Sequence, residues 1–284
     1  MPAVKIIECP RDAMQGMNAF VPTKTKIEYI NALLKVGFDT LDCGSFVSEK
    51  MIPQMADTKL ILPHLELEKS DTKLSVIVGN KRGAEEACEF DEITYIGYPF
   101  SISETFQKRN TNCDLEESMQ RVDEIINLCE CYGKTFVCYI SMAFGNPYDD
   151  FYNAALVEHW VDRLFENGIN KFSISDTIGI ATPEIITNVF SVLSEDFPEI
   201  GFGAHFHTIP STWQEKVEAA WNAGCTRFDG AMKGFGGCPM AKDELTGNMP
   251  TENLLAYFDE RKIEHGLNKD AFIDAMVLAN RIFV

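Results

Sequence analysis

Short runs rich in apolar and β-branched residues alternate with longer amphipathic stretches along this chain. The short runs predict strands over residues 4–7, 40–42, 74–78, 92–96, 135–140, 171–174, 202–207 and 226–229. The amphipathic stretches 23–36, 115–131, 153–166 and 211–223 predict helices, and a glycine soon follows each, at positions 37, 133, 168 and 224. A recurring order of helix, glycine and strand is typical of αβ units that build a parallel sheet.

Eight such strands with helices between them favour a (β/α)8 TIM barrel. A doubly wound sheet is the alternative, but the chain has neither a G-x-G-x-x-G motif after its first strand nor a phosphate-binding P-loop. Length is compatible with a single barrel, because α/β barrels reach 284 residues as one unit. We therefore expect one catalytic domain over residues 1–284, with the barrel over about 4–255 and a helical extension over about 256–284.

In a TIM barrel the active site lies where the strands end, so the residues at these ends carry the functional prediction. His205 and His207 are two of only five histidines and lie at the end of the seventh predicted strand. Residues i and i+2 of a strand point to the same face, so the two imidazoles should converge in the barrel mouth. Converging neutral imidazoles form a metal site, although two independently hydrogen-bonded histidines are the alternative.

A carboxylate near the histidines favours the metal site. Asp12 follows the first strand, which neighbours the seventh and eighth strands in a closed barrel, and Asn248 follows the eighth. Two nitrogens, a carboxylate and an amide oxygen suit Mg²⁺ or Mn²⁺ better than structural zinc, which prefers thiolates. We therefore predict a divalent-metal site formed by Asp12, His205, His207 and Asn248, with a capping role or an ion pair as the alternative for Asp12.

Two further residues at the predicted rim are candidates for chemistry. Arg11 can place a fixed positive charge on a developing oxyanion, or it can form a structural salt bridge. Cys238 lies in a glycine-rich loop after the eighth strand, where a thiol can exchange a proton with a substrate or be a bystander.

Composition and charge limit the kinds of partner that the protein can bind. Apolar residues make up 45% of the chain, and the formal net charge is −18 with no basic block. Such acidity argues against nucleic acid and anionic membrane surfaces as partners, and no apolar run approaches the ~18 residues of a membrane span. Nine scattered cysteines with no zinc-type pairs and no secretory signal indicate reduced, mostly buried thiols in a cytoplasmic protein.

Several motifs together resemble the 3-hydroxy-3-methylglutaryl-CoA (HMG-CoA) lyase family. The resemblance spans about residues 4–255, and the Arg-Asp and H-x-H pairs mark only the wider superfamily of metal-dependent TIM-barrel lyases and synthases. The G-G-C-P loop and the S-x-S-E-T-F-x-K-x-N stretch point to the lyase branch. The motifs are Arg11-Asp12, Ser45-Phe46-Val47-Ser48, Pro53-Gln54-Met55, Ser101 to Asn110, Asn112-Cys113, Asp176-Thr177-Ile178-Gly179, His205-x-His207, Gly236-Gly237-Cys238-Pro239 and Gly247-Asn248.

The resemblance implies a reaction and roles for individual residues. The expected reaction is the metal-dependent cleavage of HMG-CoA to acetyl-CoA and acetoacetate, a step of leucine degradation. Asp12, His205, His207 and Asn248 would bind the metal, Arg11 would stabilise the enolate, and Cys238 would be catalytic. Acidic catalytic positions fall on Asp42 and Asp176, and substrate contacts fall on Gln15 and Ser45.

Four positions depart from the family pattern. The acid before the Arg-Asp pair is Glu8, shifted by one residue, and a shift of one reverses the face of a strand. Ala13 replaces a glycine, Thr208 replaces an aspartate, and the segment from Cys238 to Asn248 is one residue longer. These departures leave open a related acyl-CoA or a hydroxy acid without CoA as substrate.

Two other functions stay open at this stage. One is a condensing synthase or pyruvate aldolase on the same metal site, although synthases commonly carry further C-terminal domains. The other is a non-catalytic paralogue, against which the complete metal-ligand set argues. An acyl-CoA substrate needs cations near the mouth, for which Lys108 and Arg109 are candidates, although a solvated pair is the simpler reading. A homodimer is considered, but no motif addresses it.

Overall fold

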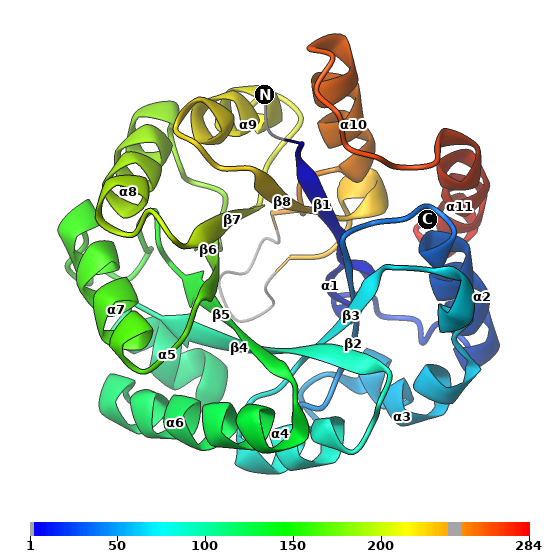
Figure 1. Ribbon diagram of the computed structural model, residues 1–284, viewed down its shortest axis with the longest axis horizontal. Helices are drawn as coiled ribbons and strands as arrows, with labels where there is room; N and C mark the ends of the chain where they lie inside the picture. Colours follow the sequence, from blue (N-terminus) through cyan, green and yellow to red (C-terminus); the bar gives the residue numbers. More distant parts are fainter. Residues whose placement is uncertain (1–2, 238–245) are drawn as a thin grey trace.

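The computed structural model describes residues 3–237 and 246–284, and its centre is a closed barrel of eight parallel strands in chain order (Figure 1). The first strand pairs with both the second and the eighth, which closes the sheet. The prediction of a TIM barrel is confirmed. The strands are β1 (Lys5–Glu8), β2 (Thr40–Ser45), β3 (Lys73–Ile77), β4 (Ile93–Ser101), β5 (Thr135–Ser141), β6 (Lys171–Asp176), β7 (Gly201–Phe206) and β8 (Arg227–Gly230).

Helices surround the barrel and cover the outer faces of the strands (Figure 1). The α-helices are α1 (Pro10–Gln15), α2 (Thr23–Leu34), α3 (Thr58–Ile61), α4 (Lys81–Cys88), α5 (Glu104–Thr111), α6 (Leu115–Tyr132), α7 (Ala154–Glu166), α8 (Pro183–Asp196), α9 (Trp213–Asn222), α10 (Thr251–Glu260) and α11 (Lys269–Ile282). Short 3-10 turns are η1 (Pro53–Met55), η2 (Leu62–His64), η3 (Leu67–Lys69) and η4 (Met232–Gly234). Within the described residues, no helix has both the length and the apolar character needed to cross a membrane.

Helix α6 shows how the local sequence sets the boundaries of these elements. The Asp114 side chain accepts a hydrogen bond from the Glu117 backbone N–H, and the Glu117 carboxylate accepts one from the Asp114 N–H. This reciprocal capping box satisfies two donors that a helix start otherwise leaves free. Gly133 ends the helix with φ 64°, a left-handed conformation that costs glycine little. The glycines expected after α2, α7 and α9 also have positive φ.

Apolar packing occupies two separate regions. The main core lies between the barrel wall and the helices, whereas a small cluster of Ile77, Val137 and Tyr139 lies apart from it. Polar side chains of β6, β7 and β8 interact with one another beside this small cluster: Ser173, His205, Arg227 and Asp229. A polar layer therefore underlies the mouth at the C-terminal strand ends.

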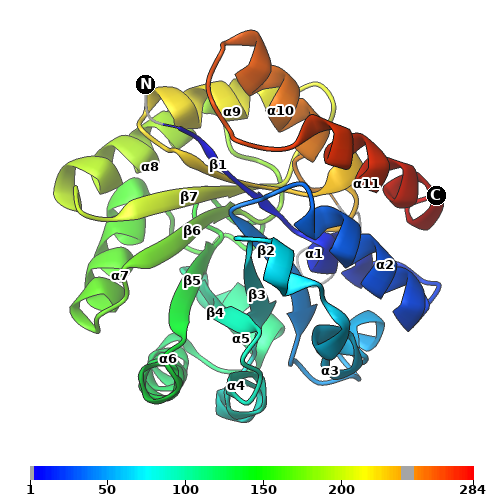
Figure 2. The same cartoon turned by 45° about the vertical axis from the view of Figure 1, so that its right-hand side comes forward.

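The chain after β8 first completes the ring of helices and then adds one more helix. Helix α10 packs against β8 and α9, so the boundary expected near residue 256 falls inside a helix of the barrel itself. Helix α11 then packs against α2 (Figure 2). Phe283, just after α11, places its ring edge-on to Tyr29 of α2 at a centroid distance of 5.9 Å.

Candidate active site

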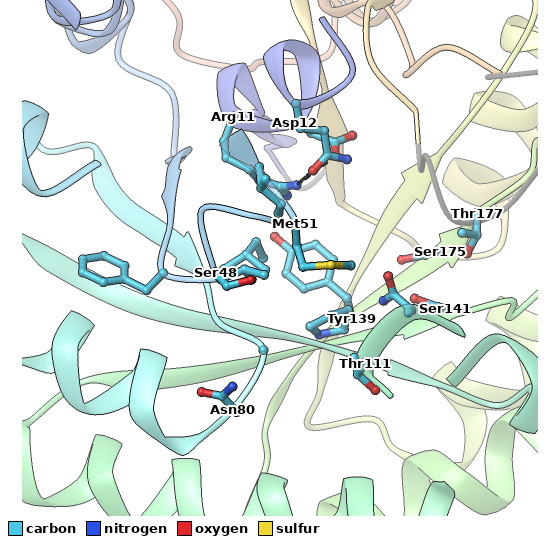
Figure 3. Close-up of a pocket in the computed structure, with 18 of the residues that line it drawn as sticks. Arg11, Asp12, Ser48, Met51, Asn80, Thr111, Tyr139, Ser141, Ser175 and Thr177 are labelled. Atoms are coloured by element: carbon cyan, nitrogen blue, oxygen red, sulfur yellow. Dashed lines mark hydrogen bonds and ion pairs between the residues drawn. The ribbon is translucent and has the colours of Figure 1, made fainter. Parts of the chain in front are cut away.

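A pocket of about 450 Å³ opens at the C-terminal ends of the strands (Figure 3). Its polar wall comes from both ends of the chain, with Arg11 and Asp12 on α1 and His205 and His207 at the end of β7. We expected Arg11 and Asp12 at the end of a strand, but β1 ends at Glu8. Pro10, which has no N–H to satisfy at a helix start, begins a six-residue helix that carries both side chains. The pocket is therefore the active-site position of this fold.

Asp12, His205 and His207 converge in this pocket as expected. One nitrogen or oxygen of each lies within 4.8 Å of those of the other two, and all three residues are buried. His205 Nε2 lies 4.0 Å from Asp12 Oδ2. Two imidazoles and one carboxylate, buried and gathered around one volume, form a donor set that fits a divalent cation.

The second nitrogen of each histidine is held by the protein. His205 Nδ1 lies 3.1 Å from Asp229 Oδ2, and His207 Nδ1 lies 2.8 Å from the Thr246 carbonyl oxygen. Both contacts require a proton on Nδ1, which leaves the Nε2 lone pair free whenever the ring is neutral. Metal-binding histidines are oriented in this way by a carboxylate or a carbonyl behind them. The partners behind the histidines therefore support the metal-site prediction independently of the histidines themselves.

These surroundings act differently on the two imidazoles. Burial disfavours the charged form of His205, but the hydrogen bond and charge of Asp229 outweigh it and raise its pKa. Burial and the neighbouring charge of His205 lower the pKa of His207. Burial also opposes ionisation of Asp12, but Arg11 and both histidines overcome it and lower its pKa. The cluster thus keeps an ionised carboxylate next to one imidazole that is held neutral.

Asn248 reaches the same cluster, with its amide nitrogen toward the carboxylate. Its Nδ2 donates to Asp12 Oδ2 at 2.6 Å and to the Phe235 carbonyl at 2.8 Å. Gly236 makes this approach possible, because a Cβ there would lie 2.4 Å from the Asp12 carbonyl oxygen and 2.6 Å from Asn248 Nδ2. The structure thus places Asn248 on Asp12, and a ligand role needs its amide oxygen in the place that Nδ2 occupies.

Arg11 forms the salt bridge that was one of its two expected roles. Nε donates to Asp42 Oδ2 at 3.0 Å, Nη2 donates to the same carboxylate, and Nη1 donates to Asp12 at 2.9 Å and Gln15 at 2.8 Å. Asp42 and Asp12 overcome the burial penalty and raise the pKa of Arg11, so its charge is permanent. Of the five guanidinium protons, one on Nη2 has no acceptor among the described residues. Arg11 lines the pocket, so the two expected roles are compatible.

Asp42 and Gln15 complete the Arg11 network. Asp42, predicted as a catalytic acid, is fully buried and does not line the pocket, and burial raises its pKa although the charge of Arg11 opposes the rise. Gln15 lines the pocket, and its Nε2 donates to Asp12 Oδ1 at 2.6 Å. Both residues therefore act directly on the arginine and carboxylate that face the pocket.

Two further predicted site residues are placed differently, and a third is not described. Asp176 does not line the pocket, whereas its neighbours Ser175 and Thr177 do. Its carboxylate accepts hydrogen bonds from Lys216 Nζ at 2.6 Å and from the N–H groups of Ile180 and Ala181. Ser45 is buried behind the pocket wall, where its Oγ accepts from the Val47 N–H at 3.1 Å. Cys238 lies outside the described residues.

The departure at Glu8 has a clear consequence. Glu8 is completely buried and accepts hydrogen bonds from the Met232 N–H and the Thr251 hydroxyl, rather than facing the pocket. Burial raises its pKa to about 8. The Glu8 side chain is thus directed away from the pocket, and it joins β1 to η4 and to the first residue of α10. Thr208 bonds to Thr212 at 3.1 Å, and Ala13 is buried.

Sequence reasoning missed Asp229, Lys216 and Tyr139. Asp229 is the last residue of the strand predicted over residues 226–229. An acid at the otherwise apolar end of a strand is a signal that could have identified it. Lys216 is a fully buried lysine on α9, which the helical pattern gave no reason to expect. The Tyr139 ring lies edge-on to His205 at a centroid distance of 5.9 Å and projects into the pocket (Figure 3).

A TIM barrel with a buried Asp-His-His cluster at its C-terminal mouth defines a class of barrel enzymes with a candidate divalent-metal centre. The HMGL-like family model matches residues 3–278. The chain belongs to this family, which is metal-dependent, and it is a lyase.

Characterised relatives cover nearly the whole chain. The cytoplasmic 3-hydroxy-3-methylglutaryl-CoA lyase of Danio rerio is 33% identical over 93% of this chain and 78% of its own. The mitochondrial hydroxymethylglutaryl-CoA lyase of Mus musculus is 31% identical over 96% of this chain and 83% of its own. An HMG-CoA lyase from Acinetobacter baumannii, solved with coenzyme A and 3-methylmalate, superimposes with a TM-score of 0.91 at 30% identity, covering 99% of this chain and 91% of that one.

Proposed function

We propose that this protein cleaves HMG-CoA to acetyl-CoA and acetoacetate with the help of a divalent cation. The observation that carries the proposal is the meeting of Asp12, His205 and His207 with Arg11 in one pocket at the strand ends. The relatives named as HMG-CoA lyases support the substrate. The reaction separates a β-hydroxy thioester into a ketone and an enolate, so it needs a cation near the hydroxyl and a positive group near the thioester oxygen.

Mg²⁺ or Mn²⁺ suits the donors at this centre. Asp12, His205 and His207 would hold the ion, and Asn248 would join them through its amide oxygen if that oxygen and Nδ2 exchanged places. No thiolate belongs to this set, and oxygen-rich mixed sets favour Mg²⁺ and Mn²⁺ over structural zinc. When bound, such an ion lowers the pKa of a coordinated hydroxyl and polarises the oxygens it touches.

Arg11 stabilises the enolate that leaves. Its guanidinium lines the pocket and is fixed on three sides by Asp42, Asp12 and Gln15, so its remaining Nη2 proton is already oriented. A donor that is fixed before the reaction stabilises a developing oxyanion without reorganisation. Cys238 or a water molecule returns a proton to the enolate carbon, as the family resemblance implies.

Two arginines among the residues that line the pocket support a polyanionic acyl-CoA as the substrate. Arg82 of α4 and Arg121 of α6 line the pocket together with Asn80. Lys108 and Arg109, the pair considered from the sequence, do not line the pocket: Lys108 is exposed and paired with Glu104 at 2.6 Å, and Arg109 lies over the Tyr148 ring. Arg82 and Arg121 therefore replace them as candidates for contact with CoA.

A cytoplasmic location and a place in leucine degradation are part of the same proposal. A cytoplasmic relative supports the location, although a mitochondrial relative matches about as well. The eight described cysteines are free thiols, and all but Cys131 are buried, as in a reducing compartment.

Direct assay tests the function. Purified protein with Mg²⁺ or Mn²⁺ is expected to release acetoacetate from HMG-CoA, and chelation of the metal should stop the release. Binding of Mn²⁺ without any product would point to another hydroxy-acyl substrate. In the same assay, a Cys238→Ala variant as active as the parent would remove the thiol from the mechanism.

A further inference from the structure

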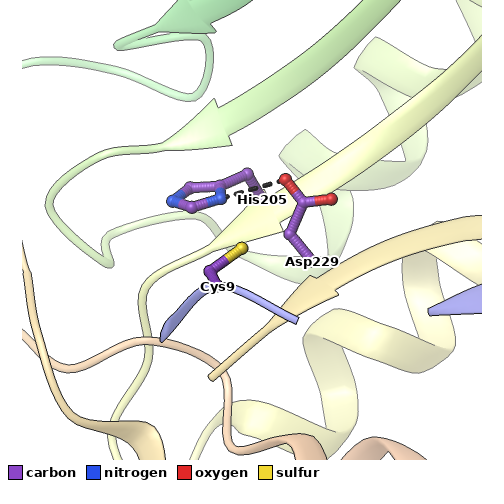
Figure 4. A group of neighbouring side chains, drawn as sticks. All are labelled: Cys9, His205 and Asp229. Atoms are coloured by element: carbon purple, nitrogen blue, oxygen red, sulfur yellow. Dashed lines mark hydrogen bonds and ion pairs between the residues drawn. The ribbon is translucent and has the colours of Figure 1, made fainter. Parts of the chain in front are cut away.

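A second group of potential metal ligands lies directly behind His205. It consists of Cys9, between β1 and α1, and Asp229 on β8, together with His205 itself (Figure 4). One ligand atom from each lies within 4.8 Å of the other two. Cys9 is 1% exposed and Asp229 3% exposed, so the group is enclosed by protein.

The bonding of Asp229 leaves capacity for a ligand. Oδ2 accepts from Ser173 Oγ at 2.9 Å and from His205 Nδ1 at 3.1 Å. Oδ1 is buried and accepts no hydrogen bond from the described residues, and its nearest cation is Arg227 Nη2 at 3.8 Å. A buried carboxylate oxygen without a donor is costly, and a cation is one way to satisfy it.

The charges around Cys9 also favour a cation. Burial and then the negative charges of Asp229, Asp42 and Asp12 raise the pKa of the Cys9 thiol, and a bound cation would offset these charges. Arg11 and Arg227 balance part of this negative charge, but each already faces a carboxylate. A thiol sulfur, an imidazole nitrogen and a carboxylate oxygen form a ligand set of the kind that binds zinc.

We infer that Cys9, His205 and Asp229 form a second, inhibitory site for a thiophilic divalent cation such as Zn²⁺ or Cd²⁺. The Asp12–His207 set, which consists of Asp12, His205 and His207, shares only His205 with this inferred site. The inferred site uses Nδ1 of the ring, whereas the Asp12–His207 set uses Nε2. Binding breaks the S–H bond of Cys9, releases that proton to solvent and forms a metal–sulfur bond. The single proton of neutral His205 moves from Nδ1 to Nε2, which frees the Nδ1 lone pair for the second bond, with no change of oxidation state. With this proton, Nε2 can no longer bind the catalytic cation. Inhibition follows because Asp229 then binds the cation and no longer orients His205.

Cadmium binding tests the site without relying on lyase activity. Cd²⁺ added to the protein is expected to produce the ultraviolet charge-transfer band of a cadmium–thiolate bond. The band should persist in Cys238→Ala and in Cys43→Ala, a matched buried thiol outside the group. It should be absent in Cys9→Ala and Cys9→Ser, of which the serine variant keeps the size of the side chain. A band of equal intensity in both Cys9 variants would overturn the inference.

Zinc inhibition tests the consequence, and this step rests on the proposed function. In the Mg²⁺-supported lyase assay, the Zn²⁺ concentration for half inhibition should rise at least about tenfold in Cys9→Ala. Unchanged inhibition in that variant would assign zinc to the Asp12–His207 set and exclude the inhibitory role. Absence of lyase activity in the parent would contradict the proposed function, whereas the cadmium band would still decide the site.

Discussion

Two buried pairs of a cation and a carboxylate lie near the barrel mouth, and they differ in what they leave free. In the first pair Arg11 lines the pocket while Asp42 is buried behind it, and the guanidinium keeps one proton without an acceptor among the described residues. Lys216 and Asp176 lie behind the wall, and all three ammonium protons are used, by Asp176 Oδ2 at 2.6 Å, the Gly179 carbonyl at 2.9 Å and the His207 carbonyl at 3.0 Å. An acid at a strand end paired with a cation is therefore not enough to indicate catalysis. The pair must also keep a hydrogen-bond donor that is free to bind a substrate.

The His207 carbonyl contact gives the second pair a different task. Lys216 joins β6, the segment after it and the backbone of a candidate metal ligand in one buried network. We therefore expect Lys216 and Asp176 to position His207 and stabilise the fold, whereas Arg11 contacts the substrate.

The largest effect is expected at the metal ligands that lie between the two pairs. Asp12→Ala and His207→Ala should each lower kcat by about 10³-fold or more, because a divalent ion supplies several kcal/mol to such a reaction. The dependence of the remaining activity on Mn²⁺ should disappear in both variants. Calorimetric titration with Mn²⁺ checks the cause, and normal turnover in either variant would contradict the ligand assignment.

Single substitutions in the two pairs should both destabilise the protein. Lys216→Met and Arg11→Met each leave a buried carboxylate without its cation, and breaking a buried pair costs about 3–5 kcal/mol. Neutralising the partner as well, in Lys216→Met/Asp176→Asn and Arg11→Met/Asp42→Asn, should recover part of this loss in urea unfolding.

Catalytic activity should distinguish the Arg11–Asp42 pair from the Lys216–Asp176 pair, although their effects on stability are similar. Arg11→Met/Asp42→Asn is expected to lower kcat by about 10²–10³-fold, the typical effect of losing one oxyanion contact. Lys216→Met/Asp176→Asn should stay within about tenfold of the parent at saturating metal. An equal loss of kcat in both double variants would restore Asp176 to the catalytic role that the sequence indicated.

The sequence predicted the barrel and most of the pocket because both depend on local patterns. Helix, glycine and strand repeat at a spacing that admits few folds, and the H-x-H spacing fixes the common direction of His205 and His207. The orientation of Asp176 was not predictable, because its partner Lys216 lies forty residues away on a helix. Asp229 was equally hidden, since its importance comes from the register that places it opposite His205 across β7 and β8.

A smaller effect is expected from the carboxylate behind the metal ligand. Asp229→Asn removes the charge that orients His205, and losses of such partners typically weaken metal binding by about 10–100-fold. Ser173→Ala is the matched control, because it removes the other hydrogen bond to Asp229 Oδ2 and keeps the charge. Mn²⁺ titration compares the two, and equal affinities would show that the charge of Asp229 does not matter to the metal.

The smallest effect is a change of metal affinity with pH, and it also tells the two histidines apart. Asp229 raises the pKa of His205 against the effect of burial, whereas burial and His205 lower the pKa of His207. Below the pKa of His205, a metal ion must displace one proton from this ring, so the apparent Mn²⁺ affinity should fall by up to about tenfold for each pH unit of acidification. Above that pKa the affinity should level off, because both imidazoles are then neutral. In Asp229→Asn the pKa of His205 should fall, so the level region should begin at a lower pH. A parent protein whose affinity is constant between about pH 6 and 8 would show that His205 binds no proton there.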